Sequence, residues 1–574
     1  MYNFLQKVPF LFEVFFNGTY ILLYVLKVSE KFPSTWPIET IDQVLMGMSW
    51  IIPFVILMVL MVNYLSSDSF EHFVRRHISS IIVFIPLVIT WGDQQFTFWL
   101  ASTHLFSSIL AIYEDDTGKL RKRVKEPQLF KGIRLRPAQM VLFSFSLMIF
   151  VGTLLLMLPI SSIGDKSIGF VDALFMATSA TCVTGLTTLS LSTDLSVFGQ
   201  VVILFLIQVG GLSIMTLYSS LTILLGRSMG MKDRVIMQDL LDVSSLEELY
   251  AMIINIIKYT FIIELWGAVV LTIAFSNEGY EFGTAIYYGF FHSISAFCNA
   301  GFALFDTSLE NYASNPLIHG TIAILITLGG LGFIVLKEMV VIITKGKSII
   351  RTTLHTKIVV TTSAILVLIG FLFVFFGEFL NALDNFTLWE KVQVSLFQSI
   401  TLRTAGFNTI PLNNLHSYTI YGFCLIMFIG GSPGSTAGGV KTTTLAILIN
   451  SIKSTLKGRK TVSIFDRTIP APLVVKATAL TFISILITSS FILLMMKIES
   501  KTAFLPLFFE VISAGGTVGL SLGVTPTLSL TGKVMIALLM LIGRIGPLTL
   551  VLAISTRVRK EGLLEYPDGR VLMG

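Results

Sequence analysis

Eight apolar segments of about 20 residues or more alternate with polar stretches from residue 138 onward. An α-helix rises about 1.5 Å per residue, so about 20 apolar residues suffice to cross the hydrocarbon core of a membrane. The segments form four pairs, and the members of each pair are separated by a shorter semi-apolar stretch rich in Ser, Thr, Ala and Gly. We therefore expect four units of helix, re-entrant loop and helix. The segments are 138–159, 199–225, 253–274, 319–336, 358–376, 418–450, 473–496 and 534–556.

One glycine aligns the four short stretches. They read SATCVTGL, SAFCNAGF, ITLRTAGF and SAGGTVGL, with Gly185, Gly301, Gly406 and Gly519 as anchors. The anchors are 116, 105 and 113 residues apart, although the residues around them have diverged. Such near-constant spacing indicates an internal repeat.

Basic residues predict the orientation of the repeats. The linkers between repeats and the two ends of the repeat array contain 25 Lys and Arg, whereas the loops beside the short stretches contain five Lys. Lys and Arg are retained on the cytoplasmic side, so the short stretches should enter the membrane from outside. All four repeats then have the same orientation, which favours a pore. The alternative is an alternating-access cation symporter, whose repeats are often inverted.

Composition supports a membrane protein and excludes other classes. Of 574 residues, 54% are hydrophobic and only 13% are charged, which is not typical of a soluble domain. Cytoplasmic loops account for the net charge of +6, so no nucleic-acid partner is expected. Three cysteines without a CxxC pair and seven scattered histidines indicate neither a metal centre nor haem. We expect no enzyme activity and no organic cofactor.

The chain divides into an N-terminal unit and the repeats. Apolar segments near 9–26, 43–65, 74–92 and 96–113 predict an accessory helical bundle of four spans in residues 1–118. No span of this unit carries arginines at every third position, so it should not sense voltage. The expected divisions are a bundle at 1–118, a basic cytoplasmic linker at 119–136, and pore repeats at 137–234, 235–355, 356–470 and 471–574.

The short stretches suggest their own chemistry. Irregular backbone at membrane depth must be buried in protein or line a watery cavity, because an unpaired amide or carbonyl in lipid costs several kcal/mol. Glycine allows close approach to a shared axis, and a ring of carbonyl oxygens can replace the hydration shell of a monovalent cation. A short helix before each loop, such as 172–180, would direct its negative C-terminal end toward the cation.

Six motifs carry a resemblance to a known family. From about residue 137 onward, the chain resembles the Trk, Ktr and HKT superfamily of potassium transporters, and most closely its KtrB-like ion-conducting membrane subunit. The motifs are ATSATCVTGLTTLS, FHSISAFCNAGFALFD, FQSITLRTAGFNT, FIGGSPGSTAGGVKTTT, ISAGGTVGLSLGVTP and EYPDGRV. The resemblance implies an all-α integral membrane protein with four pore repeats around a pseudo-fourfold axis.

The resemblance also implies a function and a selectivity filter. K⁺ would be taken up across the inner cell membrane by a multi-pass protein, with Na⁺ as a second candidate ion. Glycine in all four copies matches the potassium-selective members, whereas plant relatives with serine in the first copy transport sodium. The implied K⁺ ligands are the carbonyls of Val183, Thr184, Gly185, Asn299, Ala300, Gly301, Thr404, Ala405, Gly406, Thr517, Val518 and Gly519.

A gate is implied below the filter. The sixth apolar segment contains a run rich in Gly, Ser and Pro that cannot remain helical. The run is Gly430, Gly431, Ser432, Pro433, Gly434, Ser435, Thr436, Ala437, Gly438 and Gly439. Val440 separates it from Lys441, and a span rather than a strand precedes it, so a phosphate-binding loop is not indicated. For Arg544 two roles stay open: an electrostatic barrier to outward cation flow, or an anchor for this loop.

Other charged residues and partners complete the expectations. We expect Arg403 to point away from the axis and to form a salt bridge with a pore-helix carboxylate such as Glu510. Asp172, Asn299 and Asp306 are candidates for filter support or cation entry. The resemblance implies membrane lipid as the surroundings, a homodimer, and a cytosolic nucleotide-binding regulatory ring as a separate partner.

Overall fold

The computed structural model describes most of the repeat region and part of the N-terminal unit. The described residues are 7–28, 42–53, 56, 94–117, 137–163, 167–212, 246–345, 352–547 and 549–550. The expected span at 74–92, the basic linker at 119–136, residues 213–234 and the tail after residue 550 lie outside this part of the chain.

Each repeat begins with a long apolar helix. These helices are α6 (Pro137–Leu156), α11 (Leu246–Asn277), α15 (Leu354–Gly377) and α19 (Ala471–Ile498). By length and apolar composition, three helical stretches among the described residues can cross a membrane: 254–277, 354–377 and 471–498. A fourth span is added if the bent pair α13 (Pro316–Leu331) and α14 (Phe333–Lys345) counts as one. The chain is thus a helical membrane protein, as expected.

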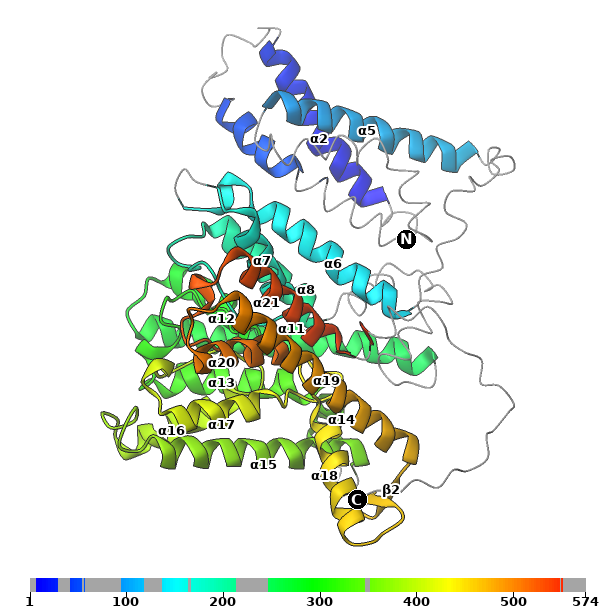
Figure 1. The fold of residues 1–574 in the computed structure, drawn as a ribbon. Helices are drawn as coiled ribbons and strands as arrows, with labels where there is room; N and C mark the ends of the chain where they lie inside the picture. The colour runs from blue at the N-terminus through cyan, green and yellow to red at the C-terminus, as the bar shows by residue number, and fades with distance from the viewer. Residues whose placement is uncertain are drawn as a thin grey trace.

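A short helix follows in each repeat, and a second apolar helix follows that. The short helices are α7 (Phe170–Thr181), α12 (Phe282–Phe297), α16 (Leu388–Thr401) and α20 (Phe504–Gly516). The second helices are α8 (Val197–Leu212), α13, α17 (Ser417–Met427) and α21 (Leu530–Ile545). Several of these begin at a polar cap, such as the capping box of Thr387 and Glu390 before α16. Helix α21 packs on α7, so the last repeat lies against the first (Figure 1).

Two of the second helices are broken. The run at 430–439 interrupts the sixth apolar segment as predicted, since α17 ends at Met427 and α18 (Thr442–Leu456) begins only after the run. The expectation of one continuous span at 319–336 is wrong. Gly332, with φ +93°, separates α13 from α14, and the two helices meet at a bend of 109°. A residue with a Cβ is strained at this φ, so glycine permits the bend.

Among the described residues, one small hairpin departs from the all-α expectation. Strands β1 (Val462–Ile464) and β2 (Arg467–Ile469) pair antiparallel between α18 and α19. The two turn residues, Phe465 and Asp466, both have positive φ. Two-residue hairpin turns with positive φ usually carry Asn-Gly or Asp-Gly, so the residue types at these two positions do not predict this turn.

The N-terminal helices form a small group of their own. Helices α2 (Lys7–Val28) and α5 (Gln94–Thr117) pack together with a helical stretch at 42–53, around a core that includes Tyr20 and Ile52. Figure 1 shows α2 and α5 at one end of the molecule, beyond α6. Three of the four expected apolar segments are therefore at least partly helical, and the fourth lies outside the described residues.

Candidate functional site

The four glycine loops meet at one place. Each loop directly follows a short helix, and each anchor glycine lies against the loop of the next repeat. The four loops therefore form a closed ring, because the fourth loop lies against the first. A Cβ added at any of the four glycines would come too close to a carbonyl oxygen of the next loop. The distance would be 2.5 Å from Gly185 to Ala300, 2.8 Å from Gly301 to Ala405 and 2.7 Å from Gly406 to Val518. At Gly519 the added Cβ would collide with the carbonyl oxygen of Thr184. Only glycine fits at these four positions.

The loops share an unusual backbone conformation. Counting the anchor glycine as position 0, the residue at position −2 also has positive φ in every copy. These residues are Val183 (φ 56°), Asn299 (φ 59°), Thr404 (φ 64°) and Thr517 (φ 51°). Positive φ is rare outside glycine, above all for a β-branched residue such as valine. Such strain persists where the surrounding structure imposes it, and it concentrates at functional sites.

The amide groups of the loops point back toward the short helices. In the first copy, the Thr184 amide donates to the Ser179 carbonyl at 2.8 Å, and the Gly185 amide donates to the Ser179 hydroxyl at 3.1 Å. The fourth copy repeats both bonds on Ser513. Ser179 and Ser513 are thus supports for the loops.

The other two copies use a related support. The Ser295 hydroxyl donates to the Phe302 carbonyl at 2.7 Å, and the Ser295 carbonyl accepts from the Ala300 amide. The third copy has Ile400 at this position, and the neighbouring Thr401 bonds the Phe407 carbonyl instead. A serine stands six residues before the glycine in three of the four aligned stretches, and no role was expected for it. Its recurrence in three of the four copies was the available signal.

The loop carbonyls are left without protein donors. Among the described residues, none of the twelve carbonyl oxygens at positions −2, −1 and 0 accepts a hydrogen bond. The residues at positions −2 and −1 are at most 1% exposed. Buried carbonyls in proteins are nearly always satisfied, so the eight oxygens at positions −2 and −1 need partners from elsewhere. The short helices also end immediately before the loops, which brings their negative C-terminal ends close to the same place.

The run 430–439 packs against the loops and against the α13–α14 break. The Ser432 amide donates to the Gly330 carbonyl at 3.1 Å, and the Phe333 amide donates to the Gly434 carbonyl at 3.0 Å. Gly438 lies against the side chain of Thr517, a residue at position −2. The run is therefore close to the −2 end of the fourth loop.

Arg544, near the end of α21, bonds two parts of this region. Its guanidinium donates to the Thr436 carbonyl in the run and to the carbonyls of Gly210 and Gly211 at the end of α8. These contacts tie the run to α8, as the anchor role requires, and the guanidinium keeps its positive charge. No sequence signal identified the two glycines of α8 as its partners.

The expected salt bridge between Arg403 and Glu510 is wrong. Both residues are described, and they form no ion pair; the Glu510 carboxylate instead accepts hydrogen bonds from the hydroxyls of Ser521, at 2.7 Å, and Thr525. Two hydroxyls from its own repeat thus occupy the carboxylate. Arg403 is buried, and its Nε has no hydrogen-bond partner.

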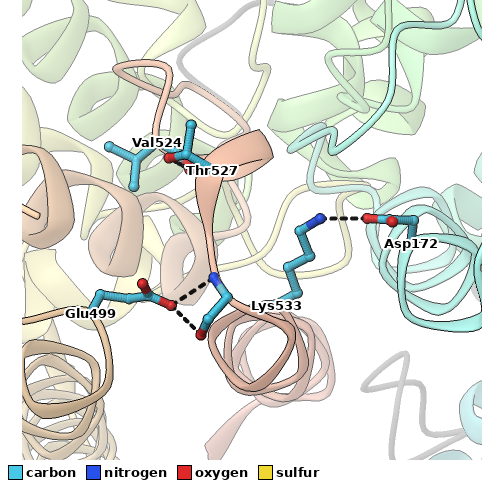
Figure 2. Close-up of polar contacts among 6 residues, drawn as sticks. Asp172, Glu499, Val524, Thr527 and Lys533 are labelled. Carbon is cyan, nitrogen blue, oxygen red and sulfur yellow. Dashed lines mark hydrogen bonds and ion pairs between the residues drawn. The ribbon is translucent and has the colours of Figure 1, made fainter. Parts of the chain in front are cut away.

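Asp172 has a structural partner. Its carboxylate lies 2.7 Å from Nζ of Lys533 on α21, so it joins the first repeat to the fourth (Figure 2). Figure 2 also shows Glu499, which accepts hydrogen bonds from the backbone and the hydroxyl of Ser529, the cap of α21. The start of α21 is therefore held on two sides.

Asp306 lies in the loop that follows the second glycine. Its carboxylate accepts hydrogen bonds from the hydroxyls of Ser190 and Ser192 in the first repeat. These bonds lower the pKa of Asp306 below its ordinary value, so the carboxylate is negative at neutral pH. Asp306 thus links two repeats and places a negative charge beyond the loops.

The site offers main-chain oxygen rather than a side-chain metal centre. Within the described part of the chain, no group of three His, Cys, Asp or Glu residues could hold a metal ion, and the three cysteines are free. The ring can therefore present carbonyl oxygens to a cation, which is the chemistry by which proteins select weakly hydrated monovalent ions.

Comparisons with known proteins place the chain in a family. Residues 135–565 match the model of the TrkH family, described as cation transport protein. The chain is 37% identical to the Ktr system potassium uptake protein B of Bacillus subtilis (strain 168), over 79% of this chain and 100% of the relative. It is 35% identical to the potassium/sodium uptake protein NtpJ of Enterococcus hirae, over 79% and 99%.

A solved structure has a similar fold. The potassium transporter TrkH from Vibrio parahaemolyticus superposes with a TM-score of 0.58 at 18% sequence identity, covering 84% of this chain and 97% of that one. The match confirms the helical membrane fold, and the sequence relatives confirm the resemblance. The chain is a multi-pass membrane protein and belongs to the TrkH family of cation transport proteins, which are transporters and not enzymes.

Proposed function

We propose that this chain takes up K⁺ through a selectivity filter formed by the four glycine loops. The observation that supports the proposal is the closed ring of four loops, whose twelve carbonyl oxygens accept no hydrogen bond from the described protein. Dehydrated K⁺ ions at successive levels of the ring would satisfy these oxygens without any side-chain charge. The four repeats surround this axis as pseudo-fourfold copies within one chain.

The ring suits a cation in three further ways. The short helices end at the ring, so their negative C-terminal ends stabilise positive charge there. The amide groups, which would repel a cation, are directed to the helix ends instead. A negative cell interior would favour inward movement by about 2.3 kcal/mol per unit charge per 100 mV.

The run 430–439 and Arg544 form the gate in this proposal. The run lies against Thr517 at one end of the loops, and Arg544 ties it to α8. An ion that passes the ring would meet the run next. Opening then requires the run to move away from the axis, and the hydrogen bonds of Arg544 resist that movement.

The assembly is part of the same proposal. Relatives in Bacillus subtilis and Vibrio alginolyticus are named protein B of a Ktr system, a name that implies a further subunit. We propose a homodimer in the inner cell membrane that binds a cytosolic nucleotide-binding ring. Mass measurement of the purified chain, alone and with such a ring, tests both parts.

Rubidium uptake tests the transport function. The purified full chain is placed in lipid vesicles, and uptake of radioactive Rb⁺ is followed with K⁺ or Na⁺ as competitor outside. We expect uptake above that of empty vesicles, with K⁺ competing at much lower concentration than Na⁺. Equal uptake with and without protein would end the proposal. Equal competition by the two ions would exclude a K⁺-selective ring.

A further inference from the structure

Helix α18 has one uncovered face that is apolar and basic. Ile449, Ile452 and Leu456 are 40%, 60% and 82% exposed, and they are three, four or seven residues apart, so they share one side of the helix. Lys453 is exposed on the same side. A helix with exposed Ile, Leu and Lys is typical of the boundary between acyl chains and headgroups.

The hairpin that follows α18 extends this surface. Phe465 at its tip is 49% exposed, and the side chains of Arg459, Lys460 and Arg467 are exposed around it. Residues 449–476 contain six basic residues and only one acidic residue, Asp466. All six basic residues are described, and none forms an ion pair or a side-chain hydrogen bond within the described chain. The surface therefore complements an anionic partner.

The next helix fixes the depth of this surface. Strand β2 ends at Ile469, and α19 begins two residues later as a 28-residue apolar helix. Such a helix is about 42 Å long, whereas the hydrocarbon core is about 30 Å thick, so its first turns reach headgroup depth. Leu473 and Val475 there are 47% and 68% exposed.

The hairpin is held in place against the repeats. Ile464 and Ile469, one from each strand, are buried against Ala446 of α18 and Ile358 of α15. Figure 1 shows α18, the hairpin and the start of α19 together at one corner of the molecule, far from the N-terminal helices. The basic side chains are thus presented on a fixed support rather than on a free loop.

We propose that α18, the hairpin and the first turn of α19 bind an anionic phospholipid of the cytoplasmic leaflet. The phosphate group would lie among Lys457, Arg459, Lys460 and Arg467, and the acyl chains would lie against Ile452 and Leu456. Lipid is favoured over a cytosolic protein because α18 packs against α19, a helix long enough to cross the membrane, and both helices expose apolar side chains at this end. The proposal is independent of the K⁺ filter.

Native mass spectrometry of the purified full chain tests the proposal. The chain is titrated with phosphatidylglycerol or phosphatidylcholine, and the bound lipid is counted. We expect a clear preference for phosphatidylglycerol. Each basic residue near an anionic surface contributes about 1 kcal/mol, so the double variant R459Q/K460Q should bind phosphatidylglycerol at least about tenfold more weakly. An unchanged melting temperature verifies that the variant is folded.

A matched control lies at the far end of α19, where Lys497 is in the last turn and Lys501 follows the helix. K497Q/K501Q removes the same charge there and should leave the lipid affinity unchanged. Equal binding of the two lipids by the wild type, or full phosphatidylglycerol affinity in R459Q/K460Q, would overturn the proposal. So would displacement of the lipid by glycerol phosphate at similar concentration, because the acyl chains would then contribute nothing. Loss of a cytosolic partner with lipid affinity intact would assign the surface to protein instead.

Discussion

Replacing Gly185 with serine is the sharpest test of the glycine ring. Gly185 has φ +96°, and a Cβ there would lie 2.5 Å from the Ala300 carbonyl oxygen and 3.2 Å from the Gly301 Cα. Both are backbone atoms of the next loop, so neither can rotate away as a flexible side chain would. The serine must therefore push two of the four loops apart.

The size of the effect follows from these distances. Cβ contacts are essentially never shorter than 3.0 Å, so the Ala300 carbonyl must move by about half an ångström or more. A ring that distinguishes K⁺ from Na⁺ through carbonyl spacing or field strength cannot keep its preference after such a shift. We expect the ratio of Na⁺ to K⁺ concentrations that halve Rb⁺ uptake to fall at least tenfold, which corresponds to about 1.4 kcal/mol.

Gly279 provides the matched control. It has nearly the same φ, +92°, but no atom lies within 4 Å of an added Cβ. The variant G279S therefore carries similar backbone strain, about 1 to 2 kcal/mol, without touching the ring. It should lose some thermal stability and keep the wild-type ion preference. If G185S is incorporated into the vesicle membrane as efficiently as the wild type and also keeps the wild-type ion preference, the role assigned to Gly185 is refuted.

Three further predictions concern the contacts between repeats. Arg544→Gln should raise the rate of Rb⁺ uptake several-fold, because it frees the run 430–439 from α8; a slower rate in folded protein would contradict the anchor role. Asp172→Asn and Lys533→Met should show a coupling energy of about 1 to 2 kcal/mol in a double-mutant cycle of the unfolding free energy, because the two side chains are only 26% and 11% exposed. Single-variant effects that add within about 0.5 kcal/mol would show that the ion pair does not stabilise the fold. Gly332→Ala should lower the melting temperature more than Gly320→Ala, because only the first has positive φ and a backbone oxygen within 3 Å of the new Cβ; equal shifts would show that the bend does not need glycine.

Much of the fold follows from local pattern. The apolar segments, the short stretches between them and the Gly, Ser and Pro run at 430–439 each follow from composition over a few residues, and the structure has helices and breaks at these places. The four anchor glycines follow from the alignment of the short stretches and from their near-constant spacing. The bend at Gly332 was not predicted, although Gly329, Gly330 and Gly332 stand within four residues, because the run around them is apolar and long enough to be interpreted as one span.

The sequence by itself determined that this chain is a helical membrane protein with a fourfold internal repeat, because hydrophobic length and repeated motifs are properties of neighbouring residues. Only the tertiary structure decided which groups meet. Asp172 pairs with Lys533 across 361 positions of sequence, and Glu510 takes two hydroxyls of its own repeat rather than Arg403. The partner of a charged side chain depends on which repeats pack side by side and on which donor lies within hydrogen-bonding distance. Neither is encoded in local pattern.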